Sequence, residues 1–329
     1  MTSGSVLIGV DVGGTTMSGG LVTPAGEVLS TVQIHTHRDG PGTALEDLLR
    51  ILEELMARSV QGGLAVGGIG IGLPGIVDAE AGRMNRGIER VTELTELPLA
   101  QRIQAKTGLP VFVDNDVNAL ALGEWRYGHG RGASSLVVLA LGTGLGGAII
   151  LDGRLQRGRS GFGGEFGHVP VKFDGRRCVC GRRGCLGAYA AGYGMAAEWR
   201  RRLGRDQGSV HVDPADDILS SANAEEVFQA AAKGDEAAGA VIREACQALG
   251  AALGGVINGL NPEVIVVTGG ILKSLVHCQA TILDWVTEYA LAQARAAARI
   301  HLVPGHKSQT VRGGAALVLY EEARHAATP

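Results

Sequence analysis

The sequence predicts an α/β fold built from two related lobes. Its 329 residues, 45% of them hydrophobic, can bury a core large enough for about two domains. Segments rich in β-branched residues alternate with segments whose apolar residues follow helical spacing, a pattern typical of α/β proteins. In addition, GVDVGGTTMSGGLV near the start and VLALGTGLGGAIIL near residue 145 repeat one strand-turn-strand pattern, which predicts the two lobes.

The first half of the chain predicts several strands and two helices. Residues 5–12 (SVLIGVDV) read as a strand that stops at Gly13-Gly14, and GGLVT and EVLSTVQI continue as strands around a turn at Gly26. Leucines at helical spacing predict a helix over residues 42–58. LAVGGIGIGLPG predicts the next strand and a loop, and the strand VFVDN then leads into a helix from Asp116 to Tyr127.

The second half continues the alternation. SLVVLAL and GGAIIL predict paired strands around a glycine turn. A long amphipathic helix is expected over residues 241–257, and Asn261-Pro262 ends it before the strand EVIVVTGG. Residues 204–223, punctuated by Gly, Pro and Asp, predict a surface loop.

Charge and hydropathy disfavour nucleic-acid and membrane partners. The net charge of -3 gives no basic field, and the arginine cluster in the middle of the chain is too short to supply one. The N-terminus, MTSGSVLIGVDVGG, lacks a basic start followed by a sufficient apolar run, and later apolar stretches are interrupted by charge or are too short to span a bilayer. We therefore expect a cytoplasmic protein that acts on small molecules.

The two glycine-rich turns predict phosphate contacts. A backbone without Cβ atoms can approach phosphate oxygens and direct N–H groups at them, and Thr15 and Thr143 add hydroxyl donors. Either turn alone is equally well explained by ordinary turn glycines, but their repetition favours binding. Neither is a GxxxxGK[ST] loop or a GxGxxG that opens a helix. Asp11, beside the first turn, can hold Mg²⁺ through water or cap the turn.

A run of polar residues, Asp114-Asn115-Asp116-Val117-Asn118, lies between the strand VFV and the following helix. One of them is expected to cap the helix, since Asp and Asn are preferred at that position. Capping leaves the other polar residues unexplained. A carboxylate at this point can accept the proton of an alcohol that attacks a phosphoryl group.

The segment GGEFGHVPVKFDGRRCVCGRRGC predicts a structural zinc site. Its thiolate and imidazole ligands suit a closed tetrahedral site, and they are His168, Cys178, Cys180 and Cys185. Disulfides are a poor alternative because Cys178 and Cys180 are too close to pair comfortably and three cysteines cannot pair among themselves. Glu165 is left free to face a substrate, or is an ordinary surface glutamate.

The motifs DVGGTT, LPG, VDNDVN, GTGLGG, EFGH, CVCGRRGC and VVTGG, in this order, resemble those of ROK-family sugar kinases over nearly the whole chain. The resemblance implies a two-lobed actin-like (ribonuclease H-like) ATPase fold with sugar and ATP in the interlobe cleft. The smaller N-terminal lobe would comprise residues 1–125 and a C-terminal helix at about 311–329. The larger lobe would comprise residues 126–310 with a zinc-binding loop at 165–187. Family members commonly form homodimers or homotetramers.

The resemblance also implies the reaction and the residues of the site. ATP, with Mg²⁺, would phosphorylate the 6-hydroxyl of a hexose, glucose above all, and Zn²⁺ would be structural. Asp116 would be the catalytic base. The implied sugar contacts are Gly75, Asn115, Asp116, Glu165 and His168, and the nucleotide site would include Asp11, Gly13, Gly14, Thr15, Thr143, Gly144, Gly269 and Gly270.

Departures from the family pattern leave alternatives open. The pattern GC-x-E, whose Glu hydrogen-bonds the sugar, has Gly187 at its last position here. Thr16 and Met17 stand where many members carry a Lys, and residues 82–97 lack the Asn-Leu and Trp of the glucokinase branch. The chain could therefore act on N-acetylglucosamine or N-acetylmannosamine, or be a sugar sensor without turnover. A DNA-binding repressor is disfavoured, because the first strand begins by about Ser5 and Asp116 is present.

Overall fold

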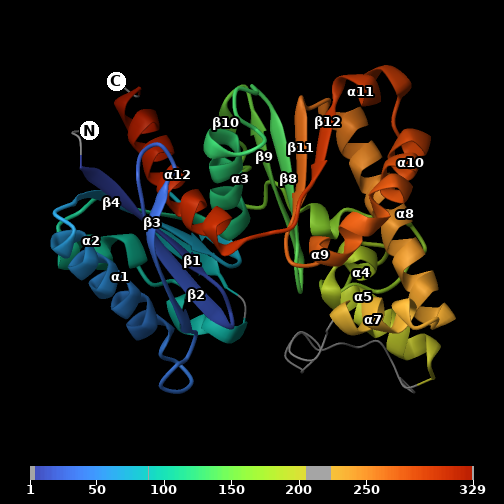
Figure 1. The fold of residues 1–329 in the computed structure, drawn as a ribbon, viewed down its shortest axis with the longest axis horizontal. Coiled ribbons are helices and arrows are strands. Elements are labelled where there is room, and N and C mark those ends of the chain that lie inside the picture. Colours follow the sequence, from blue (N-terminus) through green and yellow to red (C-terminus); the bar gives the residue numbers. More distant parts are fainter. Residues whose placement is uncertain (1–3, 88, 205–223, 328–329) are drawn as a thin grey trace. The chain divides into compact units, whose positions relative to one another are not determined.

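The computed structural model describes residues 4–87, 89–204 and 224–327 (Figure 1). Of the predicted loop at 204–223, all but Gly204 lies outside these residues. The chain divides into two compact units, which do not follow one another simply along the sequence. The first unit contains residues 1–132, 154–163 and 306–329, and the second contains residues 133–153 and 164–305.

The first unit contains a five-stranded sheet in the order β3-β2-β1-β4-β7. Its strands are β1 (Ser5–Val12), β2 (Thr16–Val22), β3 (Val28–His35), β4 (Ala65–Leu73) and β7 (Val111–Asn115). The strands β1, β2 and β3 form antiparallel pairs, whereas β1, β4 and β7 run parallel. The unit also contains α1 (Ala44–Gln61), β5 (Ile76–Asp78), β6 (Arg83–Arg86), η1 (Glu89–Leu94), α2 (Leu99–Thr107), α3 (Asp116–Tyr127), β10 (Arg154–Leu155) and α12 (Lys307–Ala326).

Helices cover both faces of this sheet, so β1 is apolar almost throughout. Alternate side chains of β1 point to opposite faces: Val6, Ile8 and Val10 pack with α1 and α2, while Leu7 packs with α12. The predicted helix at 42–58 corresponds to α1, and the predicted helix from Asp116 to Tyr127 is confirmed as α3.

Glycines bring α12 into direct contact with the sheet. A Cβ on Gly9 of β1 would lie 1.9 Å from the Val311 carbonyl oxygen, and one on Gly70 of β4 would lie 1.9 Å from the Gly314 carbonyl oxygen. On the helix side, a Cβ on Gly313 would lie 2.7 Å from the Ala119 carbonyl oxygen of α3. Only glycine permits backbones to approach this closely. The C-terminal helix is therefore an integral part of the N-terminal sheet's packing.

In the second unit, β9 (Leu145–Leu151), β8 (Leu136–Leu141), β11 (Val264–Thr268) and β12 (Arg299–Leu302) are neighbours in this order. The β8–β9 pair is the predicted antiparallel hairpin, and β8, β11 and β12 run parallel. The remaining elements are η2 (Phe166–His168), α4 (Gly187–Ala190), α5 (Gly192–Arg202), α7 (Ala224–Ala232), α8 (Glu236–Leu260), α9 (Leu272–Leu275), η3 (Val276–Cys278), α10 (Gln279–Tyr289) and α11 (Ala292–Ala297).

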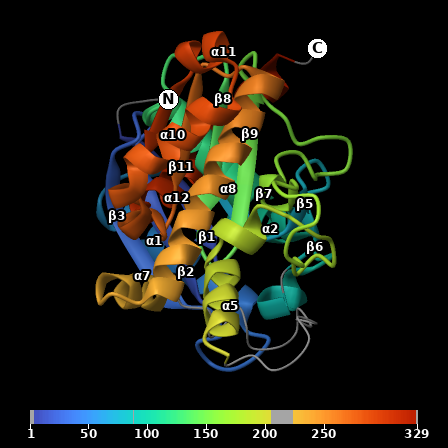
Figure 2. The same ribbon diagram turned by 90° about the vertical axis from the view of Figure 1, so that its right-hand side faces the viewer.

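Helix α8 forms the core of this unit, and Figure 2 shows it with α10 in front of the sheet. Leu249 and Leu253 are fully buried together with Val137 and Val267 of the strands. Asn261 ends the helix in the left-handed conformation, with φ of 44°, as the Asn261-Pro262 signal predicts. By length and composition alone α8 is able to cross a membrane, but 56% of its most apolar window is buried inside the unit, as in the core helix of a globular protein.

Candidate functional site

Polar and glycine residues gather at one edge of the first unit's sheet. The strands β1, β4 and β7 are parallel, so their carboxyl ends meet at the same edge. Asp11 is paired with Gly72, and Gly72 in turn with Asp114. This edge is where open α/β sheets bind ligands. The first hairpin, the Gly75 loop and the start of α3 all follow strands that end there.

The junction between β7 and α3 is held by Asn115. Its side-chain oxygen accepts hydrogen bonds from the N–H groups of Val117 and Asn118, at 2.9 and 3.2 Å, so Asn115 is the residue of the polar run that caps the helix. Its Nδ2 donates to the Gly75 carbonyl at 3.0 Å. Gly75 has φ of 104°, and a Cβ there would lie 2.2 Å from the Arg86 carbonyl oxygen. Gly75 and Asn115 thus shape one turn of the site.

Asp116 is the first residue of α3 and is half-buried. Its Oδ1 accepts a hydrogen bond from the Val117 N–H at 2.9 Å. A carboxylate in the first turn is also stabilised by the helix dipole, which favours its charged form. The Val117 N–H thus helps to orient the carboxylate at the start of α3.

Asp114 and Asn118, which capping left unexplained, belong to a buried polar network. Asp114 is 1% exposed, and its Oδ1 accepts from the Asn118 Nδ2 at 2.9 Å. Its Oδ2 accepts from the Arg157 Nε at 2.7 Å. Glu321 is a second partner of Arg157. Sequence reasoning missed Arg157 and Glu321, because they lie far from Asp114 along the chain and match no local motif.

The first glycine turn is closed by its own backbone and by Thr36. The Gly13 N–H donates to the Thr16 carbonyl at 3.2 Å, and the Thr36 hydroxyl donates to the Gly13 carbonyl at 2.6 Å. Thr15 is exposed. Beside the turn, the Lys307 Nζ lies 3.6 Å from the Asp11 Oδ2. Burial raises the pKa of Asp11, and Lys307 and Thr310 only partly oppose this.

The second unit carries its own glycine turns at one sheet edge. Because β8 and β11 are parallel, Gly142–Gly144 and Gly269–Gly270 follow neighbouring strand ends. Thr143 and Gly144 are exposed, and a Cβ on Gly144 or Gly270 would meet no atom within 4 Å. Gly269 has φ of 111°, and a Cβ there would lie 2.2 Å from the Leu141 carbonyl oxygen. These turns leave backbone open to a ligand.

The four predicted metal ligands come together in the second unit, with ligand atoms within 4.8 Å of one another. Around a tetrahedral zinc with Zn–S of about 2.3 Å and Zn–N of about 2.0 Å, neighbouring sulfurs lie about 3.8 Å apart, and sulfur and nitrogen about 3.5 Å. The Cys180 and Cys185 Sγ atoms are 3.7 Å apart, and the Cys178 Sγ is 3.6 Å from the His168 Nδ1. The spacing therefore fits zinc.

The electrostatics of this cluster suit a cation. Burial tends to raise the pKa of Cys178, but hydrogen bonds from His168 and from the Cys180 backbone outweigh it and lower the pKa to about 6. Burial and the neighbouring Cys178 raise the pKa of Cys185 to about 12. Several thiolates are costly to hold together without a positive ion, so the cluster favours a metal.

Glu165 and Gly187 flank the cluster. The His168 Nε2, on the side of the ring away from Cys178, lies 4.0 Å from the Glu165 Oε2. Gly187 is buried at the start of α4, and a Cβ there would lie 2.8 Å from the Tyr193 hydroxyl. That hydroxyl also lies 3.3 Å from the Cys178 Sγ. Tyr193, which sequence reasoning did not single out, therefore fills the space beside Gly187.

The predicted site residues thus form two sets, one in each unit. The structure brings together Asp11, Gly75, Asn115 and Asp116 with the first turn at the edge of the first sheet. It brings together Glu165, His168 and the cysteines in the second unit, where the turns at Thr143 and Gly269 lie at the edge of the sheet.

Known proteins resemble this chain in sequence and in fold. A glucokinase from Thermotoga maritima is 38% identical over 271 residues, which is 82% of this chain and 83% of that protein. A ROK hexokinase from Thermus thermophilus has a similar structure, with a TM-score of 0.80, 27% identity and coverage of 97% of this chain and 99% of that one.

A ROK family glucokinase from Streptomyces griseus, crystallised with glucose and AMPPNP, is also similar. Its TM-score is 0.70, its identity is 31%, and the match covers 95% of this chain and 98% of that one. These structural matches confirm the predicted actin-like ATPase fold class. The ROK family model itself matches residues 7–321. The chain therefore belongs to the ROK family.

Proposed function

We propose that this protein is an ATP-dependent hexose kinase that phosphorylates the 6-hydroxyl of glucose. The observation that carries the proposal is the β7–α3 junction, where Asn115 and Asp114 fix the helix start that bears Asp116. The glucokinase relatives and the glucose and AMPPNP complex of a structural neighbour support the choice of sugar and nucleotide.

In this proposal Asp116 is the base. Phosphoryl transfer through a loose transition state depends mainly on alignment and on neutralising charge. Asp116 accepts the proton of the sugar hydroxyl as it attacks, and Asn115 and Gly75 orient the sugar beside it. The rigid cap supports this role, because the carboxylate has little freedom to move away.

The nucleotide is assigned to the glycine turns. In the first unit Gly13 would shape the turn, since its N–H is used within it, and Gly14 and Thr15 would offer donors to ATP. In the second unit Thr143, Gly144, Gly269 and Gly270 would offer N–H and hydroxyl donors. Mg²⁺ usually binds one or two protein carboxylates and the substrate phosphates. Asp11, which lies near the end of β1 beside the first glycine turn, would be the carboxylate. When bound, Mg²⁺ would neutralise charge on the phosphates.

The sugar is also assigned to Glu165 and His168. Zinc would be structural, held by the His168 Nδ1 and the three thiolates, and its role would be to fix the loop. With Nδ1 committed to the metal, the Nε2 and the Glu165 carboxylate face the same side and can bind neighbouring hydroxyls. The second unit would thereby set which sugar is accepted.

We also propose how the chain is organised. The two compact units would be the two lobes, the enzyme would act in the cytoplasm, and it would form a homodimer or homotetramer. An N-acylhexosamine kinase is the second candidate. It is favoured by Gly187, which removes one side chain that would orient a hexose.

A coupled ADP-release assay tests the proposal. Glucose, mannose, fructose, N-acetylglucosamine and N-acetylmannosamine would each be offered with ATP, and with polyphosphate in parallel. We expect the highest kcat/KM with glucose and ATP. A higher value with an N-acylhexosamine would select the second candidate. Sugar binding by calorimetry without turnover of any sugar would instead indicate a sensor.

A further inference from the structure

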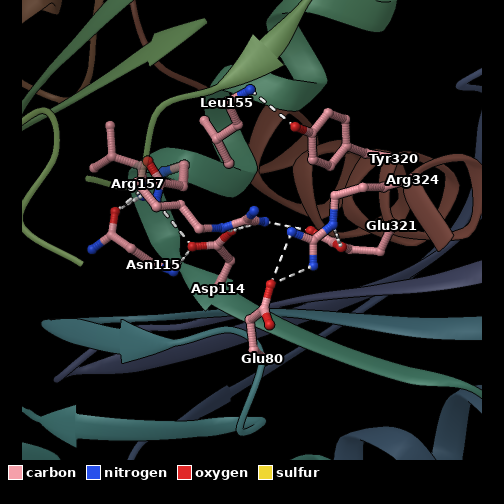
Figure 3. A network of polar contacts seen from close by, with 10 residues as sticks. Glu80, Asp114, Asn115, Leu155, Arg157, Tyr320, Glu321 and Arg324 are labelled. Atoms are coloured by element: carbon pink, nitrogen blue, oxygen red, sulfur yellow. Dashed lines mark hydrogen bonds and ion pairs between the residues drawn. The ribbon is translucent and has the colours of Figure 1, made fainter. Parts of the chain in front are cut away.

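A buried ion network includes Asp114, two residues before the proposed base, and lies within the first unit (Figure 3). Arg157 binds Asp114 with its Nε and Nη2, both at 2.7 Å, and pairs with Glu321 of α12. The side chains are 16%, 1% and 5% exposed, respectively. Figure 3 shows Asp114 and Glu321 on either side of the guanidinium. One arginine therefore compensates two buried carboxylates.

The network reaches the first turn of α3 through Asp114. While Oδ2 binds Arg157, Oδ1 accepts from the Asn115 N–H at 2.7 Å and from the Asn118 Nδ2 at 2.9 Å. Asp114 thus joins Arg157 to the residues on both sides of Asp116. A change in the direction of the Asp114 carboxylate would move these donors.

Arg157 is itself held in place from several sides. It belongs to residues 154–163, which pack with the first unit although the chain before and after them belongs to the second. The Leu155 N–H donates to the Tyr320 hydroxyl at 3.0 Å, and the Gly163 N–H donates to the Arg157 carbonyl at 2.8 Å. Burial tends to lower the pKa of Arg157, but Asp114 and Glu321 outweigh it and keep the group charged.

We propose that Arg157 is a positioning residue for phosphoryl transfer. It acts through Asp114 to fix the start of α3, and thereby the direction of Asp116, without touching the substrate. The inference rests on the proposed kinase activity and adds to it a residue that the site itself does not contain. Without the guanidinium, Asp114 would be a buried carboxylate that has lost its cationic partner, next to the carboxylate of Glu321, which is strongly unfavourable. Asp114 would then turn away and release the helix start.

Arg324 provides a matched control. It also binds Glu321, with Nε 2.8 Å from Oε2, and it contacts Glu80 at 3.1 Å. Figure 3 shows it next to Glu321 and Glu80. Loss of Arg324 therefore disturbs the same network on the side that does not include Asp114.

The test compares Arg157→Met with Arg324→Met, both assayed well below their melting temperatures. For Arg157→Met we expect kcat to fall about 10- to 100-fold with the KM for sugar nearly unchanged, since a displacement of about 1 Å can cost about 100-fold. For Arg324→Met we expect unchanged kcat with a lower melting temperature. Equal kcat in wild type and Arg157→Met, or equal losses in both variants, would overturn the inference.

Two further measurements keep the test decisive. Arg157→Lys retains the charge but cannot span both carboxylates, and we expect its kcat to lie between wild type and Arg157→Met; it replaces the Met variant if that one does not fold. Hydrogen exchange without substrates reports the positioning directly. Faster exchange of the amides of residues 114–120 is expected in the Arg157 variants only. Hydrogen exchange can be measured even if the protein phosphorylates no sugar. That result would refute the proposed function but would leave the test of how Arg157 fixes the start of α3 intact.

Discussion

The Asp116 carboxylate is the group on which the proposed chemistry depends. Asp116→Asn keeps the shape of the side chain, and its carbonyl oxygen can still accept from the Val117 N–H. The amide cannot take up a proton, so we expect kcat to fall about 100- to 10,000-fold while sugar binding is retained. Steady-state kinetics and calorimetry with the sugar measure the two quantities separately.

A surface substitution of the same kind controls for this experiment. Asp39→Asn changes a half-exposed carboxylate that forms ion pairs with Arg38 and Arg50. Its kcat should match that of the wild type. If Asp116→Asn kept more than a third of the wild-type kcat, Asp116 would not be the base.

The space beside Gly187 decides what a glutamate at this position would do. The φ angle of Gly187 lies outside the left-handed region, so a side chain causes no backbone strain. Its Cβ would, however, lie 2.8 Å from the Tyr193 hydroxyl and 3.2 Å from the Gly167 carbonyl oxygen. From the sequence alone one expects Gly187→Glu to lower the KM for glucose; the structure shows that Tyr193 must first give way.

We therefore predict different results for a single and a double variant. Gly187→Glu should lower the melting temperature without lowering the KM for glucose. Gly187→Glu/Tyr193→Phe frees the space that the hydroxyl occupies, and its KM for glucose should fall about tenfold, as expected for one added charged hydrogen bond. Tyr193→Phe alone is the control. A double variant as unstable as the single one, with unchanged KM, would contradict this explanation.

Individual residues were predictable where a short sequence pattern identifies them. The cap at Asn115 and the ligands at His168, Cys178, Cys180 and Cys185 each follow from residue type and short spacing. The partners of Asp114 do not follow from residue type and spacing. Arg157 is 43 residues away from Asp114, and Glu321 is 164 residues away from Arg157. Such pairs are made by the fold and leave no local signal.

At the scale of the elements, the loop over residues 165–187 is predicted to bind zinc. We expect about one zinc per chain in purified protein. Cys180→Ser should lower both the zinc content and the affinity for sugar, because the loop that carries His168 and Glu165 loses a ligand. Cys278→Ser changes a thiol outside the cluster and should change neither. Metal analysis that finds no zinc in active protein would refute the assignment.

We expect the protein to lose stability in acid because of Glu198 on helix α5. Burial tends to raise the pKa of Glu198, but Arg201, Arg202 and Arg176 outweigh it and lower the pKa to about 2. A depressed carboxylate pKa stabilises the fold at pH values above the unfolded value and loses this contribution as pH falls from about 4.5 to about 2. The partner Arg201 is half exposed, so solvent screening limits the contribution to about 2 kcal/mol.

The variant Glu198→Gln tests this. Above pH 5 it should be less stable than the wild type, and the difference in free energy of unfolding should shrink as the pH falls toward 2. Denaturant melts at a series of pH values measure it. A difference that stays constant over that range would show that Glu198 contributes through packing alone.

The order of strands and helices was largely predictable, because buried parallel strands and amphipathic helices differ clearly in their apolar patterns. The glycines of the two repeated segments serve different purposes. Gly19 lies against Ile51 of α1, and Gly147 lies against Phe166. These glycines permit close packing, which the sequence does not distinguish from ligand contact.

For the chain as a whole, α12 links the C-terminus to the N-terminal sheet. A chain that ends at Gly305 lacks α12 and uncovers the buried side chains Leu7 and Val22 together with the backbone at Gly9 and Gly70. The truncated chain also lacks Glu321, one of the two carboxylate partners of Arg157. We expect the first unit of this truncated chain not to fold, since exposing such a face costs more than the marginal stability of a domain.

Limited proteolysis and circular dichroism measure this outcome. A chain that ends at Ala326 keeps all of α12 and is the control, which should melt as the full chain does. A protease-resistant first unit in the shorter chain would show that the sheet is stable without its helix. The detour of residues 154–163 into the first unit has no sequence signal, because only the contacts of the folded chain define it.

The position of α12 also bears on biosynthesis. Ribosomes make the strands of the first sheet before the second unit and α12 after it, with about 180 residues between α3 and α12. At usual rates of about 5–20 residues per second, the nascent sheet waits roughly 10 to 40 s for its covering helix. During that interval one face of the sheet remains exposed to chaperones. The first unit is therefore completed only after the second unit has been synthesised.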